Sequence, residues 1–275
     1  MLIVAIVLLV NLFPRRVASA PRKPSGAEIF IHEDPAVQIN IAPSCRSLSQ
    51  LLNDQNSGKT NYGEDMRACF DPLGFNVAPH YQQWKAHVGA YTGIPSGNDR
   101  PYLSTDLKDF NGAKMNQPFV KGSKEAKMSF GKIKGQGTFC SKTRYTGSKR
   151  GRILNGATNW LHGHWGGHVG MAYYEGWISG HVYKSSNGNL LDWVVLCLSA
   201  KGENRYLNGV KQNDNIIKSG NEVDVFINTG GCCGHELSDW GAAFIVSWDR
   251  DLNHDELLKV SSFLLDGTTA PQESF

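Results

Sequence analysis

The chain has 275 residues and a formal net charge of +3, from 28 lysines and arginines against 25 aspartates and glutamates. This length is enough for a full hydrophobic core in one large or two small domains. The small net charge gives no argument for a nucleic-acid partner, and the 30 glycines favour a loop-rich β fold over a helical bundle.

The first segment, residues 1–20, is typical of a signal peptide. An apolar run from Leu2 to Phe13 is followed by Ala18 and Ala20, the small-residue pattern that precedes cleavage. The run is shorter than the roughly 20 apolar residues that span a bilayer. We therefore expect a secreted, extracellular protein that begins near Pro21 and has no membrane span after cleavage; an uncleaved anchor is the alternative.

Residues 21–116 are expected to form an irregular N-terminal extension. Residues 71–110 are not expected to be an independent domain, because they offer few apolar positions to bury. Cys45 and Cys69 bracket a polar segment that predicts a short helix and a loop closed by a disulfide. Between residues 71 and 110 the sequence is rich in turn residues, with one short helix predicted near 80–88.

From residue 117 onward the pattern changes to short strands separated by glycine and lysine. The predicted strands are 118–120, 126–133, 138–145, 169–177, 181–184, 191–200, 223–228 and 241–248. Asn208-Gly209 lies between two further short runs and is the strongest local signal for a β-hairpin. Short strands at such regular spacing predict a β-sandwich or barrel.

One helix is predicted near the end of the chain, between Asn253 and Gly267. Asn253 can cap its first turn, Glu256 stands at the third helical position of a capping box, and Gly267 is a natural terminator. Residues 268–275 remain as a tail.

Six cysteines in a secreted chain permit three disulfides. Cys45–Cys69 is the local choice, and Cys140 and Cys197 lie in strand-like runs that could bridge neighbouring strands. For Cys232-Cys233 two alternatives stay open. The adjacent cysteines could bond to each other, in a ring that would give a sugar an apolar platform, or they could form long-range bonds, for example to Cys45 and Cys69.

Residues 150–177 are the densest part of the chain in aromatic residues, glycines and histidines. His162, His164 and His168 invite a metal interpretation, since imidazole suits zinc or copper. No carboxylate or cysteine lies close to them in sequence, so structural or hydrogen-bonding histidines are the preferred interpretation.

Five aromatic side chains in this stretch could stack on sugar rings: Trp160, Trp165, Tyr173, Tyr174 and Trp177. Strand alternation predicts that about half of them face the core. Trp165, between His164 and Gly166, is expected to be exposed.

Eleven lysines and arginines fall between Lys114 and Arg152, with Glu125 as the only acid among them. Such a cluster could attract sulfated or uronic polysaccharides through charge and through arginine's bidentate fork. Solvated loop tips are the alternative, and residues 149–152 are expected to cap a hairpin.

Several motifs resemble the laminin G-like members of the concanavalin A-like lectin/glucanase superfamily. They are Trp193–Cys197, Tyr206–Gly209, and Ala242–Leu252 leading into Asp255–Leu257. The resemblance covers about residues 117–267 and implies an all-β jelly-roll sandwich of two antiparallel sheets with a short C-terminal helix. Residues 138–147 together with 159–165 resemble a secreted subgroup of this type.

Glycosidases of family 16 on this fold carry the strand pattern E-x-D-x-x-E. Glu222 and Asp224 match its first two positions, but Ile227 occupies the third, so the catalytic acid is missing. The pattern argues against that hydrolase. No cofactor is expected, although Asp192, Asp214 and Asp239 are candidate calcium ligands whose spacing specifies no site.

The resemblance and the lack of a complete catalytic set together favour non-catalytic, lectin-like binding of a glycan or matrix polysaccharide, which could be anionic. The candidate ligand-binding residues are Arg150, Arg152, Asn159, His162, His164, Trp165 and His168. Two alternatives stay open: a polysaccharide hydrolase or lyase on the same fold, and a structural extracellular protein.

Overall fold

The fold is seen in a computed structural model. It describes residues 43–53, 65–77, 82–104, 118–174, 176–178, 193–200, 204–212, 221–229, 233 and 235–267. The predicted signal peptide, the segment 21–40, the strand predicted at 181–184 and the tail lie outside these residues. None of the helices formed by the described residues is long and apolar enough to cross a membrane.

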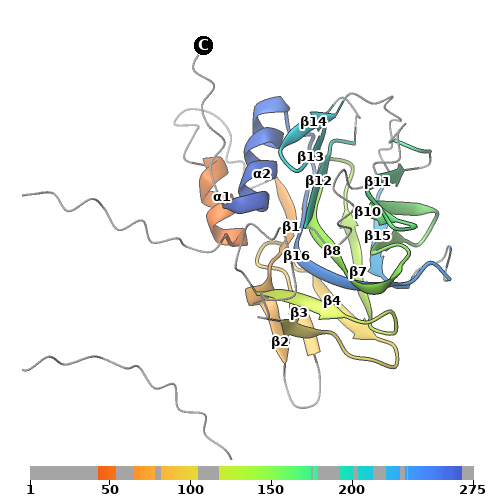
Figure 1. Cartoon of the computed structure of the whole chain (residues 1–275). Helices are drawn as coiled ribbons and strands as arrows, with labels where there is room; N and C mark the ends of the chain where they lie inside the picture. The colour runs from red at the N-terminus through yellow and green to blue at the C-terminus, as the bar shows by residue number, and fades with distance from the viewer. Residues whose placement is uncertain are drawn as a thin grey trace, which may run out of the picture. The chain divides into compact units, whose positions relative to one another are not determined.

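The described residues form an all-β sandwich of two antiparallel sheets (Figure 1). In the first sheet, β16 (Ser238–Trp248) pairs with β8 (Phe139–Arg150), β6 (Phe119–Gly122) and β1 (Met66–Phe70). The other strands of this eight-stranded sheet are β5 (Tyr102–Ser104), β12 (Val194–Leu198), β13 (Arg205–Leu207) and β14 (Val210–Gln212).

The second sheet also has eight strands. Their order across the sheet is β11 (His168–Tyr174), β10 (Trp160–Trp165), β9 (Leu154–Gly156), β15 (Val223–Ile227), β7 (Lys127–Lys134), β4 (Thr92–Ser96), β3 (Gln82–Lys85) and β2 (Phe75–Val77). Every pairing is antiparallel.

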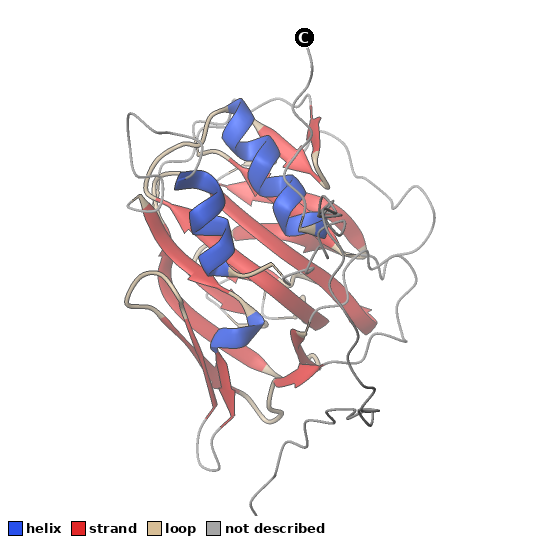
Figure 2. Ribbon diagram, turned by 90° about the vertical axis from the view of Figure 1, so that its left-hand side faces the viewer, coloured by secondary structure: helices blue, strands red, loops and turns tan. Residues whose placement is uncertain are grey.

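Two apolar layers hold the sandwich together. One contains residues of both sheets, such as Trp84, Phe139 and Trp240. The other joins the first sheet to α1 (Cys45–Asn53) and α2 (His254–Asp266), which lie side by side over the strands in Figure 2. Removing these side chains from water is the main favourable term in folding.

Two local predictions are confirmed. Asn208 and Gly209 have φ angles of 49° and 79°, the left-handed values that a type I′ hairpin turn requires, and they join β13 to β14. At α2, Asn253 and Glu256 form the complete capping box, and Gly267 ends the helix at a φ of 80°.

The described part of the predicted extension is not irregular, because its strands belong to both sheets. β1 pairs with β16 and β5 with β6, while β4 pairs with β7 and continues the second sheet through β3 to β2. The segment also supplies buried apolar residues to the core, among them Phe70, Phe75 and Trp84. Its strand β1 pairs with β16, which lies more than 100 residues downstream in the chain.

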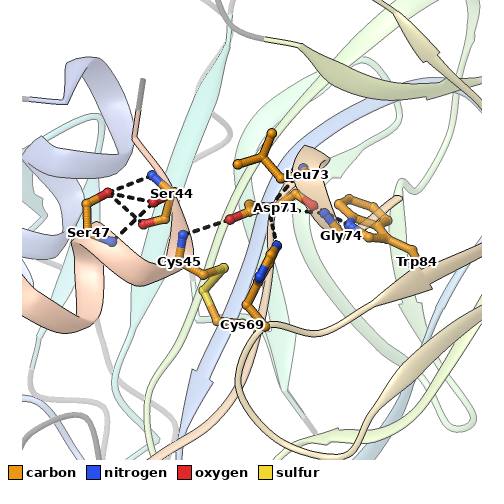
Figure 3. Close-up of polar contacts among 9 residues, drawn as sticks. Ser44, Cys45, Ser47, Cys69, Asp71, Leu73, Gly74 and Trp84 are labelled. Carbon is orange, nitrogen blue, oxygen red and sulfur yellow. Dashed lines mark hydrogen bonds and ion pairs between the residues drawn. A yellow bond between two sulfur atoms is a disulfide. The ribbon is translucent and has the colours of Figure 1, made fainter. Parts of the chain in front are cut away.

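Asp71 fixes this segment to the sandwich (Figure 3). Its buried carboxylate accepts the backbone N–H of Cys45 at 2.8 Å and that of Leu73 at 2.9 Å, and its carbonyl accepts Nε1–H of Trp84 at 2.6 Å. Hydrogen bonds to an ionised acceptor are the strong ones. One residue therefore holds three elements together: its side chain binds α1 and η1 (Pro72–Gly74), and its backbone carbonyl binds β3.

The helix predicted near 80–88 is wrong: residues 82–85 form β3. Trp84 is buried with its ring edge-on to those of Phe70, Phe75 and Phe130, and β3 pairs with β2 and β4. The burial of a large aromatic side chain and two rows of backbone hydrogen bonds outweigh a weak local helix preference.

Both predicted disulfides, Cys45–Cys69 and Cys140–Cys197, are present. Because Cys45 and Cys69 bond to each other, the alternative that linked them to Cys232 and Cys233 is excluded. Cys233 is itself disulfide-bonded, while Cys232 lies outside the described residues.

Replacing Phe70 with alanine should lower the free energy of unfolding by about 3–5 kcal/mol, as truncation of a buried phenylalanine does, because the ring is 0% exposed. Leu73→Ala, three residues away and 73% exposed, should change it by less than about 0.5 kcal/mol. Urea unfolding followed by tryptophan fluorescence measures both. A negligible effect of Phe70→Ala would mean that residues 65–77 do not unfold together with the sandwich.

Candidate functional site

One face of the second sheet points away from the interior of the sandwich. Register places Phe226 opposite Asn155, Asn155 opposite Leu161, and Leu161 opposite Tyr173, with Trp177 bridged to Tyr173. Directly opposed residues share a face, and their neighbours along the strands belong to the core between the sheets. These five residues therefore form one continuous row on the outer face.

Three aromatic rings meet at the β11 end of this row, and we call them the aromatic platform: Trp165, Tyr173 and Trp177. The ring centroids of Trp165 and Trp177 are 5.0 Å apart, and those of Tyr173 and Trp177 are 5.3 Å apart with the rings edge to face. Trp177 is 41% exposed, and the other two are half-buried. The platform offers aromatic surface to a ligand.

The turn between β10 and β11 places Trp165 at the end of its strand. Gly166 and Gly167 make this turn with φ angles of 58° and 83°, which side chains with a Cβ rarely adopt. The backbone N–H of Gly167 donates to the carbonyl of Arg150 at 2.7 Å, so the turn is held against the end of β8.

Glu236 joins the platform to charged and polar groups. Its Oε1 accepts Nε1–H of Trp165 at 2.9 Å, and its Oε2 accepts Nε–H of Arg152. Arg152 also donates from Nη1 to Oδ1 of Asn159 at 2.9 Å. The Arg152–Glu236 pair is mostly shielded from water, with side chains 7% and 22% exposed. Three of the predicted ligand-binding residues, Arg152, Asn159 and Trp165, thus converge.

The register between β8 and β16 explains why Glu236 meets Arg152. Ser238 pairs with Arg150, so residues 236 and 152 face each other just beyond the strand ends, where the backbone N–H of Arg152 donates to the carbonyl of Glu236 at 2.7 Å. Glu236 is not among the predicted ligand-binding residues. Its side-chain partners lie 71 and 84 residues away, and no local pattern marks such contacts.

His162 and His164 do not join this site, because both are 0% exposed and face the interior. His162 Nδ1 lies 2.7 Å from the Tyr174 hydroxyl and its Nε2 lies 3.1 Å from the Leu196 carbonyl, while His164 Nδ1 lies 3.2 Å from Thr143 Oγ1. Burial lowers the pKa of each histidine to about 3. They are neutral, hydrogen-bonded core residues, as preferred above.

The other predicted ligand-binding residues lie near the platform without contacting it in a described bond. His168 pairs with Trp165 across the β10–β11 turn and is half-buried. Arg150 is half-buried and donates from Nε to the carbonyl of Gly147 at 3.3 Å. As strand alternation predicts, Trp160 and Tyr174 are buried in the core.

Ten of the eleven cations between residues 114 and 152 are described, all except Lys114, and these ten do not form one surface patch. Four of them are buried: Lys134, Lys142, Arg144 and Arg152. Lys134 Nζ donates to the Asn221 carbonyl at 2.8 Å, and Lys142 Nζ donates to the Leu265 carbonyl at 3.0 Å. Burial lowers the pKa of Lys142 to about 7. The charge of this region is therefore spread over both sheets and their interiors.

Two of the carboxylates considered above, Glu222 and Asp239, have structural partners. Glu222 forms an ion pair with Arg67 at 2.9 Å, and Asp239 accepts the backbone N–H groups of Lys124 and Lys149, both at 3.0 Å. Asp192 and Asp214 lie outside the described residues. In the described part of the chain, no three histidine, cysteine or acidic side chains are grouped closely enough to hold a metal ion.

No protein-family model and no curated protein matches the chain. Among solved structures, it is similar to domain 4 of AbnA, a GH43 extracellular arabinanase from Geobacillus stearothermophilus in complex with arabinotriose. The TM-score is 0.47 and the identity 10%, over 73% of this chain and 98% of that domain.

Trypanosoma rangeli sialidase in complex with sialic acid gives a TM-score of 0.47 and 9% identity, over 80% of this chain and 37% of the sialidase. The binding domain of botulinum neurotoxin DC in complex with rat synaptotagmin II gives 0.43 and 9%, over 74% and 52%. The chain thus spans well under two thirds of the length of these two proteins. Likeness at this level says nothing of what the chain binds.

The buried histidines predict a loss of stability in acid. The unfolded chain protonates both below about pH 6.5, whereas the folded chain keeps both neutral down to about pH 3. The unfolded state therefore binds more protons in this window, and each histidine should lower the free energy of unfolding by about 1.4 kcal/mol for each pH unit below 6.5. Urea unfolding between about pH 7 and about pH 4 measures the slope.

His164→Gln provides the comparison, because glutamine cannot be protonated in this window. The variant should lose about half of the histidine contribution to the slope, whatever its stability at neutral pH. An unchanged slope would contradict the burial of a neutral His164.

Proposed function

We propose that the protein is a secreted, non-catalytic, lectin-like protein that binds a glycan or matrix polysaccharide at the aromatic platform. The observation that carries the proposal is the exposure of Trp177 in ring contact with Trp165 and Tyr173. Folding leaves this aromatic surface in contact with water, although its burial would be favourable by a free energy of about 25 cal/mol for each Å² of apolar surface.

The chemistry of the platform suits a sugar. The face of a pyranose ring presents C–H groups that pack against aromatic rings, and its hydroxyls need donors and acceptors at the ring edge. Asn159, an exposed side chain, and the Arg152–Glu236 pair supply such groups next to Trp165.

The proposed fold is a jelly roll of the laminin G/concanavalin A-like kind. Two antiparallel sheets, the Asn208-Gly209 hairpin and the capped C-terminal helix all support it. Two disulfides with fully buried cysteines support secretion into an oxidising, extracellular environment.

A non-catalytic role is favoured over hydrolysis by the position of Ile227. In the strand pattern of family 16 glycosidases this position carries an acid, and here the side chain is apolar and packs in the core between the sheets. Glu222, at the first position of the pattern, is paired with Arg67.

Trp177→Ala should weaken glycan binding by about tenfold or more, because loss of one stacking ring removes about 1.4 kcal/mol, the equivalent of a factor of ten. The full secreted chain would be screened on a glycan array with and without calcium, and the affinity of the bound glycan measured by calorimetry. The midpoint of thermal unfolding should change little, because the ring is partly exposed.

The matched control is Tyr102→Ala, which removes an aromatic ring that is 49% exposed on β5 of the other sheet. It should leave the affinity unchanged. If the wild-type chain bound no glycan, or if both variants bound as well as the wild type, the proposal would be refuted.

A further inference from the structure

The Arg152–Glu236 pair sets the charge of the site beside the platform. Arginine stays protonated at all ordinary pH values, so Arg152 would present a full positive charge if it stood alone. Glu236 Oε2 accepts Nε–H of Arg152, and the shielding of both side chains makes their attraction stronger than that of a surface pair. The two charges cancel locally.

An anionic sugar needs a free cationic fork, because carboxylates and sulfates are bound by parallel N–H donors. Two of the three guanidinium nitrogens of Arg152 are already engaged, Nε by Glu236 and Nη1 by Asn159. An incoming anion would also approach the carboxylate of Glu236, and like charges repel.

Three further cations of the described residues donate to backbone carbonyls outside this network. Arg150 turns Nε toward the Gly147 carbonyl, whereas Lys134 and Lys142 are buried and donate to carbonyls of other segments. Among the described cations, Arg152 is therefore the one bonded into the network that holds Trp165.

We infer that Glu236 makes the site selective for uncharged glycans, by neutralising Arg152 and repelling an anionic sugar. The inference rests on the proposed function and narrows its ligand class from glycans in general to neutral ones. Glu236 has a second role, since its Oε1 orients Trp165 in the platform. It is thus both a specificity-determining and a positioning residue.

The test compares matched neutral and anionic polysaccharides: dextran with dextran sulfate, mannan with alginate, and galactan with carrageenan. Binding to the full chain is measured at about 0.1 M and about 1 M salt, between which the Debye length falls from about 10 to about 3 Å. The wild type should bind a neutral probe at least about tenfold more tightly than its anionic counterpart, with an affinity that barely depends on salt.

Glu236→Gln should reverse this preference or reduce it by about tenfold, since the glutamine oxygen can still accept Nε1–H of Trp165 while Arg152 becomes an unpaired cation. Its binding to the anionic probe should weaken as salt rises. Glu222→Gln is the control: it makes the same change of charge at a glutamate that is ion-paired with an arginine, Arg67, which keeps its second ion pair with Asp249. It should keep the wild-type preference.

The double variant Arg152→Gln/Glu236→Gln removes both charges and should restore the preference for neutral glycans. The double variant can also be tested if Glu236→Gln folds poorly, because it leaves no unpaired charge in the site. The charge inference alone is overturned if the wild type prefers an anionic probe at the platform, or if Glu236→Gln leaves the ratio of affinities unchanged. Absence of binding to every probe would instead overturn the proposed function, and the inference with it.

Discussion

The pairing of β8 with β16 is the interaction on which the rest of the structure depends. These strands of 12 and 11 residues run antiparallel through the first sheet, and β16 also pairs with β6 and β1. On the other side of β8, β12 is joined both by backbone pairing and by the Cys140–Cys197 disulfide. A shift of one residue would turn every buried side chain of these strands to the opposite face.

The register between β8 and β16 also determines the geometry of the candidate site. Because Ser238 lies opposite Arg150, Glu236 falls opposite Arg152 at the point where the two strands part. The platform itself belongs to the second sheet, through β10 and β11. Glu236 therefore links the two sheets at this end, with its backbone held beside the first and its carboxylate bonded to Trp165 of the second.

The inner and outer faces of β10 have different chemistry. His162 and His164 face inward, where each is hydrogen-bonded and neutral, and Trp165 faces the platform. A β-bulge between Gly163 and His164, where the register with β11 shifts, re-aims the end of the strand. Only His164 and Trp165 follow this bulge in β10, and no spacing in the sequence marks its position.

The sequence by itself determined the features that depend on contacts within a few residues. The capping box of α2, the left-handed turn at Asn208-Gly209 and the alternation of buried and exposed rings follow from local backbone geometry. Only the tertiary structure decided that residues 82–85 form a strand and that Glu236 meets Arg152 and Trp165. Both features depend on residues that are distant in the chain. These residues come into contact only when the strands have paired in the observed register.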